Sequence, residues 1–214
     1  MTEIKELCRS YGKKIILDNI SLNIPDNKCI GILGANGCGK TTFLSTVAGV
    51  TKPDSGQIIL SDNNMQVGYV PQENPLIPDL SAYDNMLLWY KGSRSEFKNA
   101  LKGPLIEMLG INSYLKQKIK KISGGMKKKV SIAMALINEP TLLIMDEPSA
   151  ALDLNTKAEI ARYLINYKTT TGSIIITTHE ESELEICDYL YILKDGHLTN
   201  IPRETRGSEL INLL

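Results

Sequence analysis

The 214-residue sequence lacks several features that would point to common protein classes. Its 24 basic and 24 acidic side chains cancel, so overall charge does not favour a nucleic-acid partner, and none is expected. The four cysteines, which are Cys8, Cys29, Cys38 and Cys187, form no C-x-x-C pair and show no metal-ligand spacing. We expect them to be free thiols in a reducing compartment.

Long hydrophobic runs are missing as well. No window approaches the roughly 18 consecutive apolar residues that a membrane-spanning helix needs. The first residues, MTEIKELCRSYGKK, contain no apolar segment of signal-peptide length. The sequence also shows no internal repeat, linker or low-complexity segment. We therefore expect one cytoplasmic domain, residues 1–214, which could work at a membrane only if another protein held it there.

Apolar patterning divides the chain into strand-rich and helical parts. Short apolar runs between turn residues predict strands in the first 60 residues, and YLYILKDGHL predicts a hairpin with Asp195 and Gly196 in its turn. From Pro78 to about Leu115, apolar residues recur at intervals of three and four, which predicts helices. This order predicts an α/β fold with a small antiparallel β-subdomain and an inserted helical subdomain, roughly residues 78–135.

The glycine-rich stretch GILGANGCGKTTF contains Gly34, Gly39, Lys40 and Thr41 in the spacing G-x-x-x-x-G-K-[ST], that of a phosphate-binding P-loop. It lies between the apolar run KCIGIL, a predicted strand, and a predicted helix. Glycines let the backbone turn its N–H groups inward, and the helix N-terminus adds positive partial charge. The alternative is a glycine-rich turn with an incidental lysine. The residues predicted to contact a nucleoside triphosphate are Gly34, Asn36, Gly37, Cys38, Gly39, Lys40, Thr41 and Thr42.

The apolar run TLLIMDEP ends in two carboxylates, Asp146 and Glu147. In a P-loop protein, an aspartate at the end of a buried strand can bind Mg²⁺ directly or through water. Asp146 is that candidate, with the Thr41 hydroxyl as a second ligand. Glu147 is then predicted to polarise the attacking water as a general base. The sequence therefore predicts a P-loop core that binds a nucleoside triphosphate and Mg²⁺.

A third fragment, ISGGM, begins at Ile122 and opens a predicted helix. With the P-loop and TLLIMDEP, it makes the chain similar, over nearly its full length, to the ATPase subunit of an ATP-binding cassette (ABC) transporter. The family's signature is usually LSGGQ, so Met126 replaces the glutamine. The resemblance implies that Ser123, Gly124 and Gly125 contact the γ-phosphate of ATP bound to a partner subunit. A Ser-Gly-Gly helix start is also an anion site on physical grounds.

The remaining family motifs follow in the family's order. Gln72 in YVPQE matches the Q-loop glutamine, which the resemblance implies senses Mg²⁺ and couples to the membrane subunit. Asp153 in SAALD matches the D-loop, although Ala150 and Ala151 depart from the usual residues. His179 after IIITT matches the switch histidine at the γ-phosphate, and Tyr11 matches the aromatic residue that stacks on adenine.

Each motif also has a simpler interpretation. Ser123 alone is typical of an ordinary helix N-cap, His179 of a strand-end histidine, and Tyr11 of an edge-packing residue. A lysine-rich segment around the signature suggests nucleic acid, but three consecutive lysines cannot share one helical face, so we interpret them as a solvated surface. The lysines of this segment are Lys116, Lys118, Lys120, Lys121, Lys127, Lys128 and Lys129.

One P-loop and one signature in a chain imply a dimer, either a homodimer or a pair with a similar ABC ATPase subunit. The resemblance implies a subunit that powers transport through ATP-driven dimerisation, held by a transmembrane permease subunit at the inner face of the cell membrane. One alternative is a soluble ABC ATPase that serves complex assembly or nucleic-acid processing. A small-molecule kinase is a more distant alternative, because its lid would need clustered arginines and this chain has few, dispersed ones.

Overall fold

Two sheets organise the computed structural model, which describes residues 1–60, 65–149, 152–178 and 180–214. The antiparallel sheet has the strand order β2–β1–β4, with β1 (Thr2–Tyr11), β2 (Lys14–Ile24) and β4 (Ser55–Ile59). The second sheet has the order β5–β6–β7–β3–β8–β9 and is parallel except for its last pair. Its strands are β3 (Cys29–Leu33), β5 (Val67–Val70), β6 (Leu142–Asp146), β7 (Ser173–Thr177), β8 (Tyr189–Lys194) and β9 (His197–Ile201).

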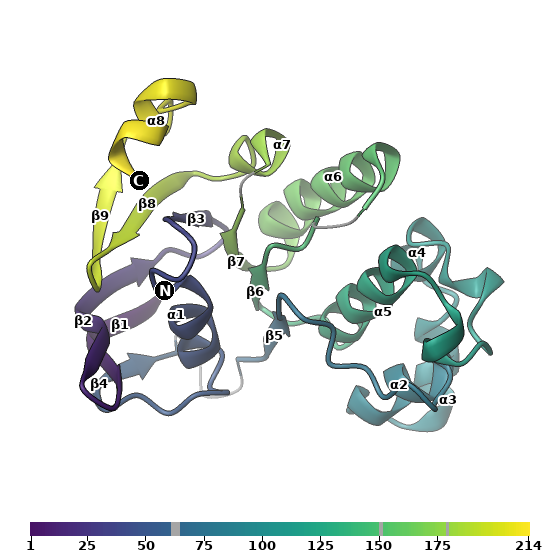
Figure 1. Ribbon diagram of the computed structural model, residues 1–214. Helices are drawn as coiled ribbons and strands as arrows, with labels where there is room; N and C mark the ends of the chain where they lie inside the picture. Colours follow the sequence, from purple (N-terminus) through teal and green to yellow (C-terminus); the bar gives the residue numbers. More distant parts are fainter. Residues whose placement is uncertain (61–64, 150–151, 179) are drawn as a thin grey trace.

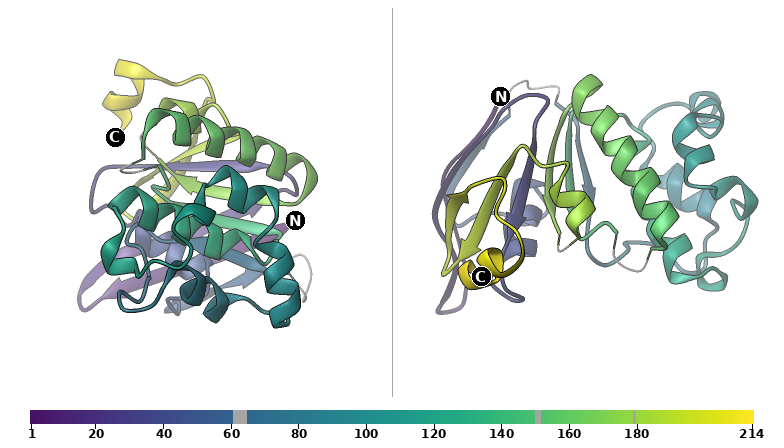
Figure 2. Two further views of the ribbon diagram at one scale, coloured as in Figure 1. Left: turned by 90° about the vertical axis from the view of Figure 1, so that its right-hand side faces the viewer. Right: turned by 90° about the horizontal axis from the view of Figure 1, so that it is seen from above.

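The helices lie around the second sheet and in a separate block. Around the sheet are α1 (Lys40–Val47), α6 (Leu154–Thr170), α7 (Glu181–Leu184) and α8 (Gly207–Leu213). The block contains α2 (Ala82–Trp89), α3 (Arg94–Ala100), α4 (Pro104–Met108), two short 3-10 helices (Ile111–Ser113 and Ile119–Lys121) and α5 (Gly124–Leu136). Figures 1 and 2 show the block and the antiparallel sheet on opposite sides of the parallel strands.

Strand alternation divides the interior into two cores. In β6, Leu142 and Ile144 pack with β1, β2 and α1, whereas Leu143 and Met145 pack with α5, α6 and the helical block. Successive side chains of a strand point to opposite faces, so a strand that is buried on both faces must be apolar throughout. The predicted strand TLLIMDEP is therefore a central strand, which places its terminal carboxylates at the edge of the sheet.

Local signals explain where the helices of the block begin and end. Ser81 and Ser93 each accept a hydrogen bond from the third backbone N–H of the helix that follows, in capping boxes with Asp84 and Glu96. Gly103 stands before Pro104, which is the first residue of α4. The run FKNALKGPLIEMLGI therefore forms two short helices, because proline favours the first position of a helix and disfavours its interior.

The predicted α/β fold, antiparallel sheet and inserted helices are present. The limits 78–135 for the helical subdomain stay a prediction. The hairpin is confirmed: Lys194 pairs with His197 across a turn in which Asp195 and Gly196 have φ of 49° and 82°. Within the described ranges, no helix is both long and apolar enough to cross a membrane.

The interpretation of the lysine segment as a solvated surface is wrong for Lys128. This side chain is only 3% exposed. Its Nζ donates hydrogen bonds to the backbone carbonyls of Pro71, at 3.2 Å, and Gln72, at 3.1 Å. Three successive lysines on a helix point in different directions, so one of them can face the interior while its neighbours stay partly exposed.

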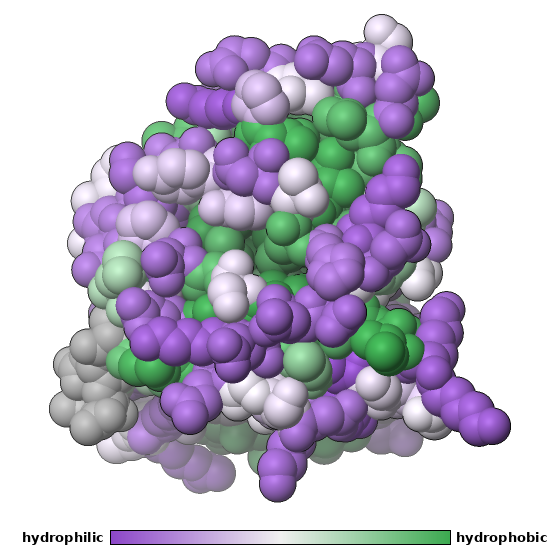
Figure 3. All heavy atoms as spheres, turned by 90° about the vertical axis from the view of Figure 1, so that its left-hand side faces the viewer, coloured by the Kyte–Doolittle hydropathy of each residue, from purple (hydrophilic) through white to green (hydrophobic). Residues whose placement is uncertain are grey.

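Apolar side chains also show on the face that carries α8. Figure 3 shows them between α8, at the top of the view, and the strands below, among a mostly hydrophilic surface. Leu210 and Leu214 pack against the core on that side, whereas no residue of α8 itself is fully buried. The packing of this last helix therefore depends on a few partly buried leucines.

The core of the helical block gives a stability prediction. Phe97 is fully buried and contacts the rings of Tyr83 and Tyr90, with centroids 5.2 and 5.3 Å away. Phe97→Ala should lower the free energy of unfolding by about 3–5 kcal/mol, because it removes these contacts and leaves a cavity. Urea denaturation measures the loss, and Phe97→Leu, which refills most of the volume, is the control. A loss below about 1 kcal/mol for Phe97→Ala would contradict this packing.

Candidate functional site

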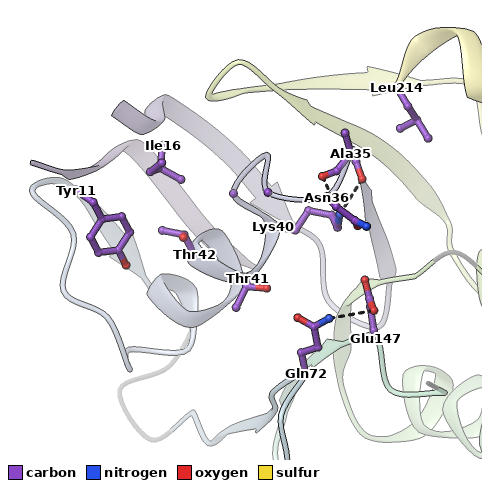
Figure 4. A pocket seen from close by; sticks show the side chains of 13 residues that line it. Tyr11, Ile16, Ala35, Asn36, Lys40, Thr41, Thr42, Gln72, Glu147 and Leu214 are labelled. Atoms are coloured by element: carbon purple, nitrogen blue, oxygen red, sulfur yellow. Dashed lines mark hydrogen bonds between the residues drawn. The ribbon is translucent and has the colours of Figure 1, made fainter. Parts of the chain in front are cut away.

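A cavity of about 680 Å³ opens at the carboxyl ends of the parallel strands. Figure 4 shows Tyr11 at one end, Gln72 and Glu147 at the other, and the P-loop between them. The residues that line the cavity are Tyr11, Ile16, Gly34, Ala35, Asn36, Gly37, Gly39, Lys40, Thr41, Thr42, Gln72, Glu147 and Leu214. An aromatic end, a glycine-rich wall and a polar end match the base, the phosphates and the reacting end of a nucleotide.

The P-loop connects β3 directly to α1, and glycine is required at two of its positions. Gly39 has φ of 114°, and a Cβ atom there would lie 2.7 Å from Ile16 Cγ2. Gly34 has φ of 155°, and its Cβ would lie 2.6 Å from the Leu193 carbonyl oxygen. A side chain at either position would push the loop away from β2 or β8. The close approach keeps the loop narrow and directs its N–H groups toward the cavity.

Lys40 lies under this loop, with only 7% of the side chain exposed. Its Nζ donates to the carbonyl oxygens of Gly34, at 2.7 Å, and Ala35, at 3.2 Å. The ammonium group is therefore at the edge of the cavity and satisfied by two backbone oxygens. Phosphate oxygens are stronger partners for it, because charge-assisted hydrogen bonds to anions exceed those to neutral carbonyls.

Strand register brings three polar side chains together beside Lys40. Asp146 pairs with Thr177 across β6 and β7, and Thr177 pairs with Ile32 across β7 and β3. The Asp146 carboxylate, 1% exposed, accepts hydrogen bonds from Thr41 Oγ1 at 2.6 Å and from Thr177 Oγ1 at 2.5 Å. Two hydroxyl donors thus orient a buried carboxylate toward the start of α1.

Gln72 and Glu147 meet for the same geometric reason. Val70 pairs with Met145 across β5 and β6. Gln72 and Glu147 each stand two residues after one of these partners, just past the ends of the two strands. Gln72 Nε2 lies 3.4 Å from Glu147 Oε2. Glu147 has the positive φ of 48°, and its N–H contacts Thr177 at the carbonyl oxygen and at Oγ1. Such a backbone is unusual for glutamate and is common at functional sites.

The aromatic end of the cavity is held in place from behind. The ring of Tyr11 is 51% exposed, and the guanidinium carbon of Arg9 lies 4.8 Å from its centroid. Arg9 in turn contacts Asp54 Oδ1 at 2.7 Å, and the Ser10 N–H donates to Asp54 Oδ2 at 2.7 Å. The Ser10 hydrogen bond and then Arg9 lower the pKa of Asp54. One face of the ring is thus covered by a cation and fixed.

The signature residues lie elsewhere. Ser123 is the N-cap of α5 and accepts a hydrogen bond from the Met126 N–H at 3.3 Å. The N-cap interpretation of Ser123 is therefore confirmed. Ser123 and Gly124 are exposed, and neither they nor Gly125 line the cavity. Gly124 has free space where a Cβ would be. An anion could approach this helix start only from outside the chain's own P-loop site.

Two further predicted residues, Cys38 and Asp153, stand apart from the cavity lining. Cys38 is partly buried and packs against the core beside α1, and it is not among the residues that line the cavity. The Asp153 carboxylate caps α6, where Thr156 donates from its N–H at 3.0 Å and its hydroxyl at 2.7 Å. These bonds from Thr156 lower the pKa of Asp153. His179, like Ala150 and Ala151, lies outside the described residues.

Sequence reasoning missed several residues of the site. Ile16 and Leu214 line the cavity, and Thr177 holds Asp146. A second buried acid, Glu183, accepts hydrogen bonds from the hydroxyls of Ser149 and Thr178, and burial raises its pKa. In the sequence, only the pair Thr177 and Thr178, at the end of the apolar run III, gave a signal for these residues. Hydroxyl groups at the end of a central strand are well placed to contact the ends of neighbouring strands.

Comparison with known proteins agrees with this geometry. The sequence model of the family described as "ABC transporter" matches residues 17–150. The linearmycin resistance ATP-binding protein LnrL of Bacillus subtilis is 33% identical over 96% of this chain and 70% of that protein. The chain belongs to the ABC transporter family. The Nod factor export ATP-binding protein I of Paraburkholderia xenovorans is a further relative of this ABC subunit, 34% identical over 91% of this chain and 68% of that protein.

Solved structures of ABC proteins share the fold. A dimeric post-hydrolysis state of the ATP-binding cassette MJ0796, bound to ADP and Pi, superposes with a TM-score of 0.84 at 25% identity, over 96% of this chain and all of that one. An ATP-binding subunit of an ABC transporter has the same score at 26% identity, over 94% and 89%. The predicted fold and function are confirmed: this protein is the ATP-binding subunit of an ABC transporter and an ATPase.

The aromatic end of the ABC site gives a binding prediction. Tyr11→Ala should weaken ATP binding about 5- to 150-fold, because stacking of a base on an aromatic ring contributes about 1–3 kcal/mol. Tyr11→Phe keeps the ring and should bind like the wild type. Titration with ATP measures both dissociation constants, and Tyr189→Ala, at an exposed tyrosine outside the cavity, is the control. Equal affinity for wild type and Tyr11→Ala would remove Tyr11 from the base site.

Proposed function

We propose that this subunit hydrolyses ATP between two ABC ATPase subunits, with the P-loop of one facing the signature of the other. The observation that carries the proposal is the separation of the two phosphate-binding elements. The cavity is lined by the P-loop, whereas Ser123, Gly124 and Gly125 lie on α5, outside it. A helix start with free N–H groups and no bulky side chain suits a γ-phosphate presented by a second chain. That second chain is a copy of this one or a similar subunit.

The residues at the polar end of the cavity fit Mg²⁺. Thr41 Oγ1 and Asp146 Oδ2 lie 2.6 Å apart, and Thr41 and Gln72 line the cavity. Mg²⁺ prefers hard oxygen ligands, uses few from the protein, and takes the rest from phosphates and water. Thr41, Asp146 and Gln72 would therefore hold the ion, which neutralises charge on the transferred phosphate. No cluster of three acidic, histidine or cysteine ligands occurs within the described ranges, so this arrangement relies on the nucleotide itself.

Glu147 is the proposed general base. Asp146 is engaged by two hydroxyls and directed toward α1, so it is poorly placed to take a proton from water. Glu147 is half-buried, lines the cavity and has Gln72 beside it at 3.4 Å. It would accept the proton of a water that attacks the γ-phosphorus, while ADP leaves and Pi forms. His179 is proposed to contact the γ-phosphate, and Asp153 to lie near the partner subunit.

A transmembrane permease subunit is the proposed membrane partner, which would hold the subunit at the cytoplasmic face of the cell membrane. Apolar side chains in and just before the helical block support a protein partner there: Ile77, Leu88 and Trp89 are 48%, 62% and 58% exposed. Relatives named for Nod factor export and linearmycin resistance support an exporter. Identifying the membrane protein that co-purifies with the subunit, and testing whether Trp89→Ser releases it, examines this partner.

The mechanism is tested with Glu147→Gln. General-base catalysis contributes about 10²- to 10⁴-fold, so the variant should lose roughly 3–5 kcal/mol of transition-state stabilisation. ATP binding should survive, because the amide keeps the shape of the side chain. ATP then persists between the subunits, and the dimer should accumulate. Steady-state ATPase assays and gel filtration with and without ATP measure the two effects.

A substitution that blocks binding is the matched control. Lys40→Ala removes the buried phosphate-side cation and should abolish both ATP binding and the ATP-dependent dimer. If Glu147→Gln hydrolysed ATP near the wild-type rate, Glu147 would not be the base. If it were inactive yet monomeric with ATP, the base would stand, and a different ABC subunit would be the partner.

A further inference from the structure

The buried lysine of the signature helix α5, Lys128, is not among the residues proposed to bind or hydrolyse the nucleotide. Lys128 is 3% exposed and does not line the nucleotide cavity. Its helix α5 begins at Gly124, so Lys128 stands about one turn inside the helix. Burying an ammonium group costs free energy unless polar groups replace its water. An apolar residue would fill this position without that cost, so the contacts that Lys128 makes are informative.

Its partners are two consecutive backbone carbonyls on either side of one functional residue. Lys128 Nζ donates to the Pro71 oxygen at 3.2 Å and to the Gln72 oxygen at 3.1 Å. These oxygens belong to the peptide groups that precede and follow the Gln72 Cα. Because both peptide planes are held by one ammonium group, the backbone dihedrals of Gln72 are restrained.

The P-loop contains the same arrangement. Lys40, also buried, donates to the consecutive carbonyls of Gly34 and Ala35, just after β3. Lys128 does this just after β5, but from a distant helix, 56 residues further along the chain than Gln72. A charge-assisted bond to a carbonyl is stronger than a neutral one, and each lysine uses it to fix the loop that follows a strand of the parallel sheet, β3 in its interior or β5 at its edge.

Electrostatics explains why a cation can stay at this position. Burial lowers the pKa of Lys128, whereas the nearby charges of Asp146, Glu147 and Glu183 act in the opposite direction. The carboxylates at the ends of the strands thus favour a cation behind the Gln72 loop. Burial of the Lys128 ammonium group costs desolvation free energy, and the neighbouring carboxylates offset part of that cost. This links the lysine to the site rather than to general packing.

We propose that Lys128 is a positioning residue, whose ammonium group fastens the signature helix to the Gln72 loop and so sets the Gln72 side chain beside Glu147. The place of Gln72 against Glu147 and the place of Ser123–Gly125 then depend on one contact. If the partner's nucleotide moved α5, the Lys128 contact would transmit that movement to Gln72, at the polar end of this chain's own cavity. This inference rests on the proposed function, because it takes Gln72 to act in hydrolysis.

The experiment is a double-mutant cycle on the full subunit with Lys128→Met, Gln72→Ala and the combination. Lys128→Met keeps the length of the side chain, and replacing a buried charge by an apolar group is often tolerated. ATP affinity should stay within about twofold, because Lys128 is outside the cavity. The kcat should fall roughly 10- to 100-fold, because Gln72 would be misplaced beside Glu147. The double variant should be no slower than Gln72→Ala alone, because Lys128 acts through Gln72.

Two further variants separate positioning from stability. Lys128→Arg keeps a charged donor and should recover part of the lost kcat, whereas the exposed Lys116→Met should leave kcat unchanged. Thermal unfolding is measured for each. If Lys128→Met does not fold, Lys128→Gln replaces it, because the shorter amide cannot reach both carbonyls and should show the same fall in kcat.

The outcomes distinguish this inference from the proposed function. A wild-type kcat in Lys128→Met, or rate losses that multiply in the double variant, would overturn the positioning role and leave a structural lysine. If Gln72→Ala kept the wild-type rate while Lys128→Met lost it, action through Gln72 would be overturned. Failure of the proposed mechanism itself would appear independently, as full activity in Glu147→Gln.

Discussion

The register of the parallel strands is the constraint on which the site depends. Met145 opposite Val70, and Thr177 opposite both Asp146 and Ile32, bring the P-loop, the two carboxylates and Gln72 to one edge of the sheet. A slip of one residue in any pair would turn a strand's side chains to the opposite face. Because these strands are buried on both faces and packed into two separate cores, such a slip would expose an apolar face on each side. The packing that stabilises the sheet therefore also sets the geometry of the chemistry.

Buried cations hold two loops that follow strands of the parallel sheet, β3 in its interior and β5 at its edge. Lys40 and Lys128 each donate to a pair of consecutive carbonyl oxygens, and each is nearly inaccessible to water. Their surroundings differ in an instructive way. Lys40 comes from the helix that follows its own loop, so the contact is local, whereas Lys128 joins the helical block to the sheet. The local contact shapes the P-loop, and the long-range one fixes α5 of the helical block relative to the loop that follows β5.

The P-loop and the signature motif of this ABC subunit stand in different parts of one chain. The P-loop lines the cavity, whereas Ser123, Gly124 and Gly125 stand at the start of α5 and are not among the lining residues. The dimeric state of the neighbouring cassette structures is in keeping with a site completed by a second subunit. A helix N-terminus favours an anion, so this separation is the physical argument for the proposed second subunit.

The sequence by itself determined the phosphate loop, the strand-end carboxylates, the signature and the α/β class, because each is a short pattern whose chemistry follows from neighbouring residues. It also predicted the hairpin at Asp195 and Gly196, since turn geometry is local. Lys128 could not be read from it, because three adjacent lysines look alike until a helix is packed and one of them faces inward. The same holds for Thr177 beneath Asp146 and for Ile16 and Leu214 at the cavity wall, whose partners are far away in the chain. Only the tertiary structure decided these contacts, because strand register and helix rotation are set by the burial of whole faces and not by any local motif.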